Sequence, residues 1–392
     1  MPASQFPLWS GCLTTVVCFL VAAQVARHSR FFRTEIEQLG KGGRYGELDG
    51  LRGFLAFGVF LTHAASSVGW YRTGAWIWPE STIYTLCGRV PVALFFMITG
   101  FLFSHKLMIS RKPIAWHRLY LSRLRRLAPL YLFVTAVIFF VVGEKTGWVM
   151  HVPPAELAWA ALKWLSLGVL GHADLNGIPQ SWILDPAMWT LRYEWIFYAL
   201  LPLLALLTTI RRFCALTAVV LVLVYGVHVL GPVSVNFLFG TAAALIYTRY
   251  RTLKSLEKQF AALAALAALC ATALPFAQDY GVLQSLLVFP VFICALYGNS
   301  FFALLSSRPA QILGLASYSV YLNHGIMLYA GLQLVNLVLP VASMNAIVYG
   351  GVILAIGLLT TGMSLLTFRF IEYPFMATSQ KADQAAGAAA KA

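Results

Sequence analysis

The stretch LDGLRGFLAFGVFLTHA, residues 48–64, decides the fold. It is apolar apart from Asp49, Arg52, Thr62 and His63. With the residues up to 67 it reaches the length of about 20 residues that a helix needs to cross the hydrocarbon core of a membrane. An ionisable side chain at the centre of such a helix costs about 2.5–3.5 kcal/mol on insertion scales. Arg52 and His63 are therefore candidates for function.

The spacing of Arg52 and His63 places them on one face of the predicted helix. They are eleven residues apart, which turns a helix through about 1100° and leaves the two side chains within about 20° of each other. The same separation is about 17 Å along the helix axis. Taken alone, Arg52 could follow the charge bias of a cytoplasmic helix end, and His63 could be a hydrogen-bonded packing residue. As a pair on one face they favour function.

The composition of the whole chain is that of a membrane protein. Of its 392 residues, 60% are hydrophobic and 11% are charged, whereas a soluble domain has about 25% charged residues. A soluble protein is excluded on this ground. The formal net charge of +14 does not indicate a nucleic-acid partner, because the basic residues lie in short loops between apolar runs.

The apolar runs predict an all-α fold, a polytopic membrane helix bundle of about ten core helices with one extra N-terminal helix. Basic residues follow the first run rather than precede it, which favours a retained helix over a cleaved signal peptide. The predicted spans lie at roughly 9–27, 48–67, 88–107, 127–143, 187–208, 213–230, 233–249, 259–276, 281–297, 311–334 and 345–368.

The loop charges predict the orientation of these spans. Lys and Arg cluster in the loop 105–126 and in every second loop after it. The loops at 68–87, 277–280 and 335–344, on the other side of the predicted spans, are nearly free of them. This asymmetry places the N-terminus outside and the C-terminus in the cytoplasm. We interpret the apolar part of the long outer segment 144–186 as an interfacial or re-entrant helix, because a further span would invert every later loop.

Three regions follow from these predictions. Residues 1–46 would form the extra helix and a basic cytoplasmic linker, and residues 47–376 one membrane domain. The tail 377–392 is rich in Ala, Gly and Lys and has few apolar anchors, which is typical of disorder.

A second ionisable anomaly is Glu194, which lies in WTLRYEWIFY, residues 189–198, at the predicted outer start of a span. A carboxylate there could orient an imidazole or act as a base. The structural alternative is an interfacial ion pair with Arg192.

The basic stretch LSRLRRLAPLY, residues 121–131, enters the fourth predicted span from the inside. Arg123 and Arg126 are three residues apart and so neighbours on a helix, a fork suited to phosphate oxygens. Membrane orientation alone is an equally good explanation of the cluster.

Polar residues also interrupt the tenth predicted span, in LASYSVYLNH at residues 315–324. Tyr321 and His324 are about one turn apart and, with Tyr318, could share a polar cavity that binds a substrate. Hydrogen bonding between helices is the alternative. Glu372, after the last span, could pair with a basic loop residue.

At these residues the chain resembles the integral-membrane acyltransferase family three, the type that O-acetylates bacterial polysaccharides and O-antigens. The resemblance covers about 47–376, and its most specific part is the LDGLRG opening with Arg52 and His63 at the family's spacing. The chain departs from the pattern at Thr99, at Arg192 and in its extra first helix. The supporting stretches are VALFFMITGFLFS at 92–104, the Arg123 and Arg126 pair, WTLRYEWIFY, FGTAAALI at 239–246, LASYSVYLNH, and EYPF at 372–375.

The resemblance implies an acyl-CoA-dependent membrane O-acyltransferase in the bacterial inner membrane, surrounded by membrane lipids. Acetyl-CoA would be delivered from the cytoplasm, and a glycan or lipid-linked saccharide hydroxyl outside would accept the acetyl group. His63 and Arg52 would be needed for activity, and Arg123 and Arg126 would serve the donor side. Our own hypothesis is that His63 acts as a general base, or takes the acyl group covalently, and that Glu194 or His324 orients it.

A transporter or flippase is the main rival, since intramembrane Arg, His and Glu could form a substrate or proton path. A membrane scaffold without activity is a weaker rival. The sequence contains no phosphate-binding GxxxxGK[ST] loop and no HExxH motif, so we expect neither ATP-driven transport nor a metal cofactor. The acceptor and the oligomeric state are not encoded in these motifs.

Overall fold

The computed structural model describes residues 6–39, 45–110, 113–206, 210–226, 230–275 and 278–377. Within these ranges the chain forms helices joined by turns and irregular loops, and no β-strand. The predicted all-α fold is therefore confirmed. Residues 40–44 of the predicted basic linker, Arg111 and Lys112, and the tail from residue 378 lie outside the described residues.

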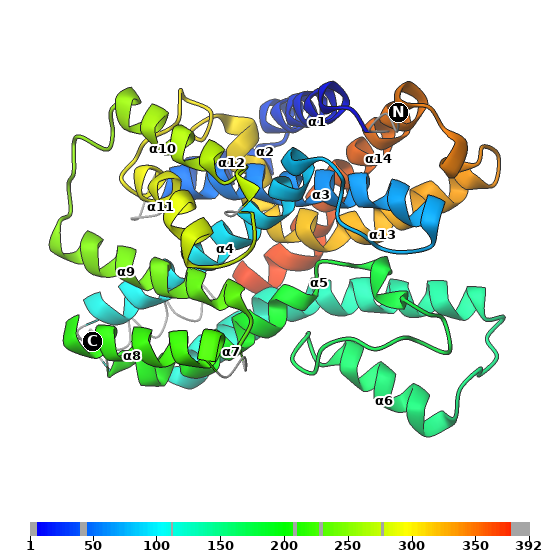
Figure 1. Ribbon diagram of the computed structural model, residues 1–392, viewed down its shortest axis with the longest axis horizontal. Coiled ribbons are helices and arrows are strands. Elements are labelled where there is room, and N and C mark those ends of the chain that lie inside the picture. Colours follow the sequence, from blue (N-terminus) through cyan, green and yellow to red (C-terminus); the bar gives the residue numbers. More distant parts are fainter. Residues whose placement is uncertain are drawn as a thin grey trace.

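Fourteen α-helices carry the described part of the chain (Figure 1). They are α1 (Leu8–His28), α2 (Arg30–Leu39), α3 (Gly46–Thr73), α4 (Thr82–Ile109), α5 (Trp116–Lys145), α6 (Pro154–Leu165), α7 (Trp189–Ala205), α8 (Ile210–Leu221), α9 (Val235–Arg249), α10 (Gln259–Ala271), α11 (Val282–Leu296), α12 (Arg308–Leu315), α13 (Ser317–Asn336) and α14 (Ala346–Thr367), which continues as a π-helical turn, η6 (Phe368–Glu372).

A helix lies at each of the eleven predicted spans, but their lengths differ. In the described ranges, α1, α3, α4, α5 and α14 with its extension are long and apolar enough to cross a membrane. The apolar helices α10 and α11 are shorter. The predicted span at 311–334 is wrong in one respect, because the chain breaks at Ala316 into α12 and α13. The apolar pattern runs through this break without a change.

The centre of the bundle is α3, which packs against α4, α12 and α13 (Figure 1). Small residues bring α3 and α12 into backbone contact. A Cβ atom added to Gly53 would lie 2.6 Å from the Ala310 carbonyl oxygen, and one added to Gly314 would lie 1.8 Å from the Asp49 carbonyl oxygen. Only glycine allows so close an approach. This contact fixes the start of α3, where Arg52 lies.

The extra N-terminal helix α1 belongs to the bundle rather than standing apart from it. It packs against α14 and α12. A Cβ atom at Gly350 of α14 would lie 2.2 Å from Ser10 Oγ, so the two helices also meet at a glycine. By contrast, α6 lies at the edge of the molecule beside α5 (Figure 1). Its 12 residues span about 18 Å, too short to cross a membrane.

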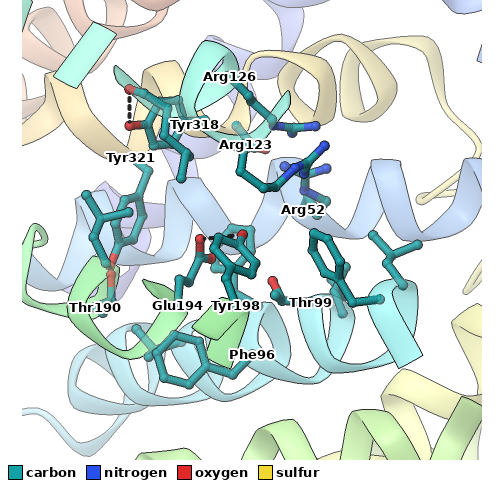
Figure 2. A pocket seen from close by; sticks show the side chains of 18 residues that line it. Arg52, Phe96, Thr99, Arg123, Arg126, Thr190, Glu194, Tyr198, Tyr318 and Tyr321 are labelled. Carbon is teal, nitrogen blue, oxygen red and sulfur yellow. Dashed lines mark hydrogen bonds between the residues drawn. The ribbon is translucent and has the colours of Figure 1, made fainter. Parts of the chain in front are cut away.

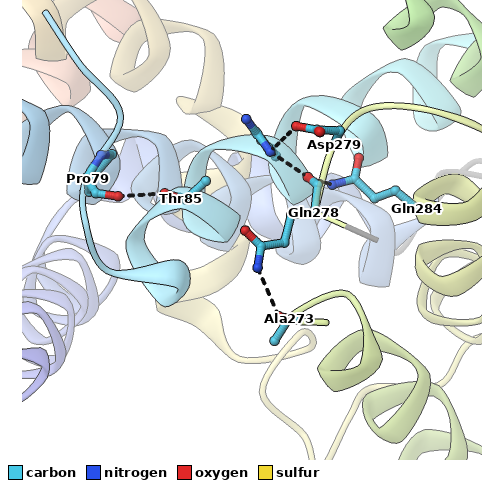
Figure 3. Close-up of polar contacts among 7 residues, drawn as sticks. Pro79, Thr85, Ala273, Gln278, Asp279 and Gln284 are labelled. Atoms are coloured by element: carbon cyan, nitrogen blue, oxygen red, sulfur yellow. Dashed lines mark hydrogen bonds and ion pairs between the residues drawn. The ribbon is translucent and has the colours of Figure 1, made fainter. Parts of the chain in front are cut away.

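Polar contacts tie α4 to the segment between α10 and α11 (Figure 3). Arg89 Nη1 donates to the Asp279 carboxylate at 2.6 Å and to the Gln278 carbonyl oxygen at 2.9 Å. Its guanidinium lies 4.7 Å from the centre of the Trp78 ring. Gln284 Nε2 donates to the same Gln278 carbonyl at 3.0 Å. These contacts anchor one end of the bundle.

Candidate active site

A single helix, α3, carries both Arg52 and His63. Arg52 Nη1 lies 3.6 Å from the Asp49 carboxylate, one turn earlier on the same helix. The two residues open onto different cavities, which we call the arginine cavity and the histidine cavity. The axis of α3 therefore connects the two halves of the site.

The arginine cavity brings together three cations that the sequence placed in two separate motifs. Arg52 comes from α3, and Arg123 and Arg126 come from α5. Figure 2 shows their side chains converging on one end of the cavity, which has a volume of about 100 Å³. Guanidinium groups gathered in this way suit a ligand with several phosphates. Arg123 also lies 5.2 Å from the centre of the Phe103 ring.

Glu194 faces the same cavity (Figure 2). Tyr198, one turn later on α7, donates a hydrogen bond of 3.0 Å to Glu194 Oε2, while Arg192 is exposed. The sequence placed Glu194 and the arginine pair at opposite ends of their spans. The structure instead brings Glu194, Arg123 and Arg126 to the same cavity.

The histidine side of the site contains a contact that sequence spacing could not reveal. His63 Nδ1 lies 2.7 Å from Nε2 of His324 on α13. The two rings stack with their centres 4.9 Å apart and 13° between their planes. His324 is 0% exposed and lines neither cavity. Both ring nitrogens of His324 already have partners, Nε2 in His63 and Nδ1 in the Val320 carbonyl, which does not support a substrate-binding role. Of the two predicted orienting groups it is His324, not Glu194, that contacts His63.

The hydrogen bonds of His324 assign the protons of the neutral pair. His324 Nδ1 lies 3.1 Å from the Val320 carbonyl oxygen. A carbonyl only accepts, so Nδ1 carries the proton and Nε2 presents a lone pair. His63 must then donate from Nδ1, which leaves its own Nε2 unprotonated. The pair thus holds His63 in the tautomer of a general base.

The histidine cavity is small and aromatic. His63 lines it together with Trp70, Tyr71, Trp76 and Tyr329, and its volume is about 10 Å³. The Trp76 ring is centred 5.7 Å from the His63 ring. The cavity would therefore have to widen before any ligand larger than a water molecule could reach His63.

Tyr321 lies between the arginine cavity and His324. Its ring lines the arginine cavity and is centred 6.1 Å from the ring of His324. Its hydroxyl lies 2.8 Å from Thr190 Oγ1 and donates to the Ala187 carbonyl oxygen at 3.1 Å. Tyr318 also lines the arginine cavity and donates to the Leu127 carbonyl oxygen at 2.8 Å.

Sequence reasoning missed Thr190 and Tyr198, which line the arginine cavity with Glu194. A signal for both was present, since each is four residues from Glu194 and so shares its helix face. Glu372, which was expected near a basic loop residue, is buried and accepts a hydrogen bond from Ser319 of α13.

A family model described as an acyltransferase domain matches residues 45–367. The chain belongs to acyltransferase family three. The match runs from the residue before α3 to the end of α14, so it contains every side chain of both cavities.

This member of acyltransferase family three is thus an integral-membrane acyltransferase. No curated protein and no solved structure matches the chain. Within the described residues, no group of three His, Cys, Asp or Glu side chains is arranged to hold a metal ion.

Proposed function

We propose that this acyltransferase moves an acetyl group from cytoplasmic acetyl-CoA to a hydroxyl of an extracytoplasmic glycan or lipid-linked saccharide. The observation that carries the proposal is the His63–His324 contact of 2.7 Å. It leaves His63 Nε2 free as a base, on the same helix as an arginine that lines a cation-rich cavity. Separate sites for a phosphate-bearing donor and for an acceptor suit acyl transfer across a membrane.

The donor would bind in the arginine cavity. Arg123 and Arg126 would hold the phosphates of CoA, and Arg52 would hold the end of the CoA molecule that lies nearer to α3. The distance of about 17 Å along α3 from Arg52 to His63 is comparable with the length of the pantetheine arm. Tyr318 and Tyr321 would line the path of that arm.

Transfer would then use His63 as a general base. His63 Nε2 takes the proton of the acceptor hydroxyl, whose oxygen forms a bond to the thioester carbon. The C–S bond breaks, and the CoA thiolate takes the proton from His63. His324 supports the positive charge that His63 carries between these events by accepting its Nδ1 proton in a hydrogen bond.

This scheme includes an orientation and a domain division. The N-terminus would lie outside and the C-terminus in the cytoplasm of a bacterial inner membrane, with residues 47–376 as the membrane domain. The arginine cavity would then open toward the cytoplasmic supply of acetyl-CoA. The loop charges support this orientation.

The test is transfer by the purified protein in lipid nanodiscs. Labelled acetyl-CoA is offered with a panel of oligosaccharides and polyprenyl-linked saccharides, and CoA release and a mass gain of one acetyl group are measured. We expect wild-type transfer, its loss in His63→Ala, and no effect of His28→Ala, an exposed histidine at the end of α1. Transport of a saccharide with no use of any acyl-CoA would contradict the proposal and favour the flippase reading.

A further inference from the structure

Residues 181–188, which we call the dividing loop, lie between the two cavities; they form a 3-10 turn (Ser181–Leu184) followed by irregular backbone, and all but Trp182 are buried. Its Ile183 and Pro186 line the histidine cavity. Its Ala187 accepts the hydrogen bond of Tyr321, which lines the arginine cavity. Irregular backbone within a membrane protein is tolerated where it is buried in protein or lines a cavity, and it often lies at a functional site.

The dividing loop is pressed against α13 at the residue that follows His324. A Cβ atom added to Gly325 would lie 2.8 Å from Asp185 Cα and 3.0 Å from the Leu184 carbonyl oxygen. The backbone of Asp185 is therefore fixed beside the turn of α13 that carries Tyr321 and His324. The phenols of Tyr131, Tyr318 and Tyr321 lie within electrostatic range of its carboxyl group.

The carboxyl group of Asp185 has an unused oxygen. Asp185 is 2% exposed, and its Oδ1 accepts from the Ala187 backbone N–H at 3.2 Å. Its Oδ2 is buried without a hydrogen-bond partner in the described part of the chain. Burial raises the pKa of Asp185 well above its usual range, because a buried charge without a partner is costly. With Oδ1 accepting, the acid proton belongs on Oδ2, which makes Oδ2 a donor that awaits an acceptor.

We propose that Asp185 is a hydrogen-bond donor to the carbonyl oxygen of the acyl group during transfer. This proposal rests on the proposed function. When the acceptor oxygen bonds to the thioester carbon, the electron pair of the C=O bond moves onto the carbonyl oxygen, and the O–H of Asp185 stabilises that charge. Asp185 keeps its proton throughout. The electron pair on the carbonyl oxygen re-forms the C=O bond as the C–S bond breaks and the thiolate of CoA leaves. Fixed donors aimed at such an oxygen are among the largest contributions to enzymatic acyl transfer.

The substitutions Asp185→Asn and Asp185→Leu should differ in their effect on the rate of transfer. Asp185→Asn keeps a donor at the position of Oδ2 and an acceptor at that of Oδ1, so it retains transfer close to the wild-type rate. Asp185→Leu removes the donor and lowers kcat by about 10²–10³-fold, with KM for acetyl-CoA nearly unchanged. Glu80→Leu, at an exposed carboxylate before α4, is the control and keeps the wild-type kcat. Loss of transfer in Asp185→Asn equal to that in Asp185→Leu would overturn the proposal.

A second measurement covers the case in which Asp185→Leu does not fold. In the infrared difference spectrum between wild type and Asp185→Asn, the wild type shows the C=O stretch of a protonated carboxylic acid, and the band shifts to lower frequency when acetyl-CoA is added. A spectrum that shows a carboxylate instead would overturn the proposal. If the wild-type protein transfers no acetyl group, the proposed function and this proposal fail together. If it transfers and the Asp185 variants behave otherwise than stated, this proposal fails alone.

Discussion

At the scale of single residues, the site depends on which atom of His63 is free. In the neutral pair the two hydrogen bonds point the same way: His63 donates to His324, and His324 donates to the Val320 carbonyl oxygen. Both contacts of His324 are made in a site from which water is excluded, since the residue is 0% exposed. Hydrogen bonds in such surroundings are stronger than in water, and an unpaired polar group there costs more. The tautomer of His63 is therefore well defined.

Replacement of His324 tests this arrangement. His324→Leu leaves the Nδ1 proton of His63 without an acceptor, so we expect transfer to fall by about 10²-fold or more and the protein to lose about 1–3 kcal/mol of stability. His324→Gln offers an amide oxygen and restores part of the rate. The measurement is kcat with acetyl-CoA for both variants. Equal activity of His324→Leu and wild type would show that the tautomer is not set by His324.

Replacement of Arg126 tests the donor side. Arg126→Ala removes one guanidinium from the arginine cavity, and a charge-assisted hydrogen bond of this kind contributes about 1.5–3 kcal/mol. We expect KM for acetyl-CoA to rise by about tenfold or more, with a smaller change in kcat. Arg192→Ala, at an exposed arginine of α7, is the control. A changed kcat with an unchanged KM would place Arg126 outside donor binding.

Part of this residue-scale picture could be predicted from the sequence. Helix periodicity placed Arg52 and His63 on one face, and Arg123 beside Arg126, because these relations are local. The pairing of His63 with His324 joins residues 261 positions apart, and no local rule contains it. Asp185 gave no signal, because its burial depends on a loop that folds between helices.

At the scale of helices, glycine contacts hold α3 in place. Gly53 of α3 and Gly314 of α12 occupy positions where a side chain would meet backbone atoms of the partner helix. Backbone cannot move aside as the end of a flexible side chain can, so these contacts are sensitive to size. They sit beside Arg52, which links the packing of α12 to the arginine cavity.

Gly314→Ala tests this packing. The added methyl group would lie 1.8 Å from the Asp49 carbonyl oxygen, so we expect a loss of about 1–3 kcal/mol from overpacking and a lower melting temperature in detergent. Gly362→Ala on α14, with no heavy atom within 4 Å of the added carbon, is the matched control and keeps or raises stability. Equal melting temperatures for Gly314→Ala and wild type would mean that α12 shifts without cost.

The helices themselves were largely predictable, and the break between α12 and α13 was not. Apolar length predicts a membrane helix well, and each predicted span contains one. The helix breaks at position 316, which is an Ala and not a Pro or Gly. The break accompanies the close contact of α12 with α3, a tertiary feature that hydropathy does not record.

At the scale of the whole molecule, loop charge predicts the orientation in the membrane. The net charge of +14 is concentrated in loops that the positive-inside rule assigns to the cytoplasm. Under the proposed function, this orientation would put the arginine cavity within reach of cytoplasmic CoA. Donor and acceptor would then approach from opposite sides of the bundle, and neither would have to cross the membrane.

The orientation can be tested with cysteine labelling. Ser343→Cys lies in a predicted outer loop and Thr252→Cys in a predicted inner loop, and both positions are exposed. In intact spheroplasts a membrane-impermeant thiol reagent should label Ser343→Cys, whereas Thr252→Cys should be labelled only after permeabilisation. The wild-type protein corrects for its own six cysteines. The reverse pattern would invert the topology and, with it, the proposed donor side.

The contact between α3 and α13 also has a consequence for how the enzyme is made. A chain is made from its N-terminus, so His63 leaves the ribosome early, whereas His324 lies in the second-to-last α-helix of the described residues. A partly inserted chain therefore contains Arg52, Arg123 and Arg126 before it contains His324, the partner of His63. Under the proposed function, a truncated or stalled product that ends before α13 would lack the residue that orients His63, and would therefore not consume the acetyl-CoA of the cell.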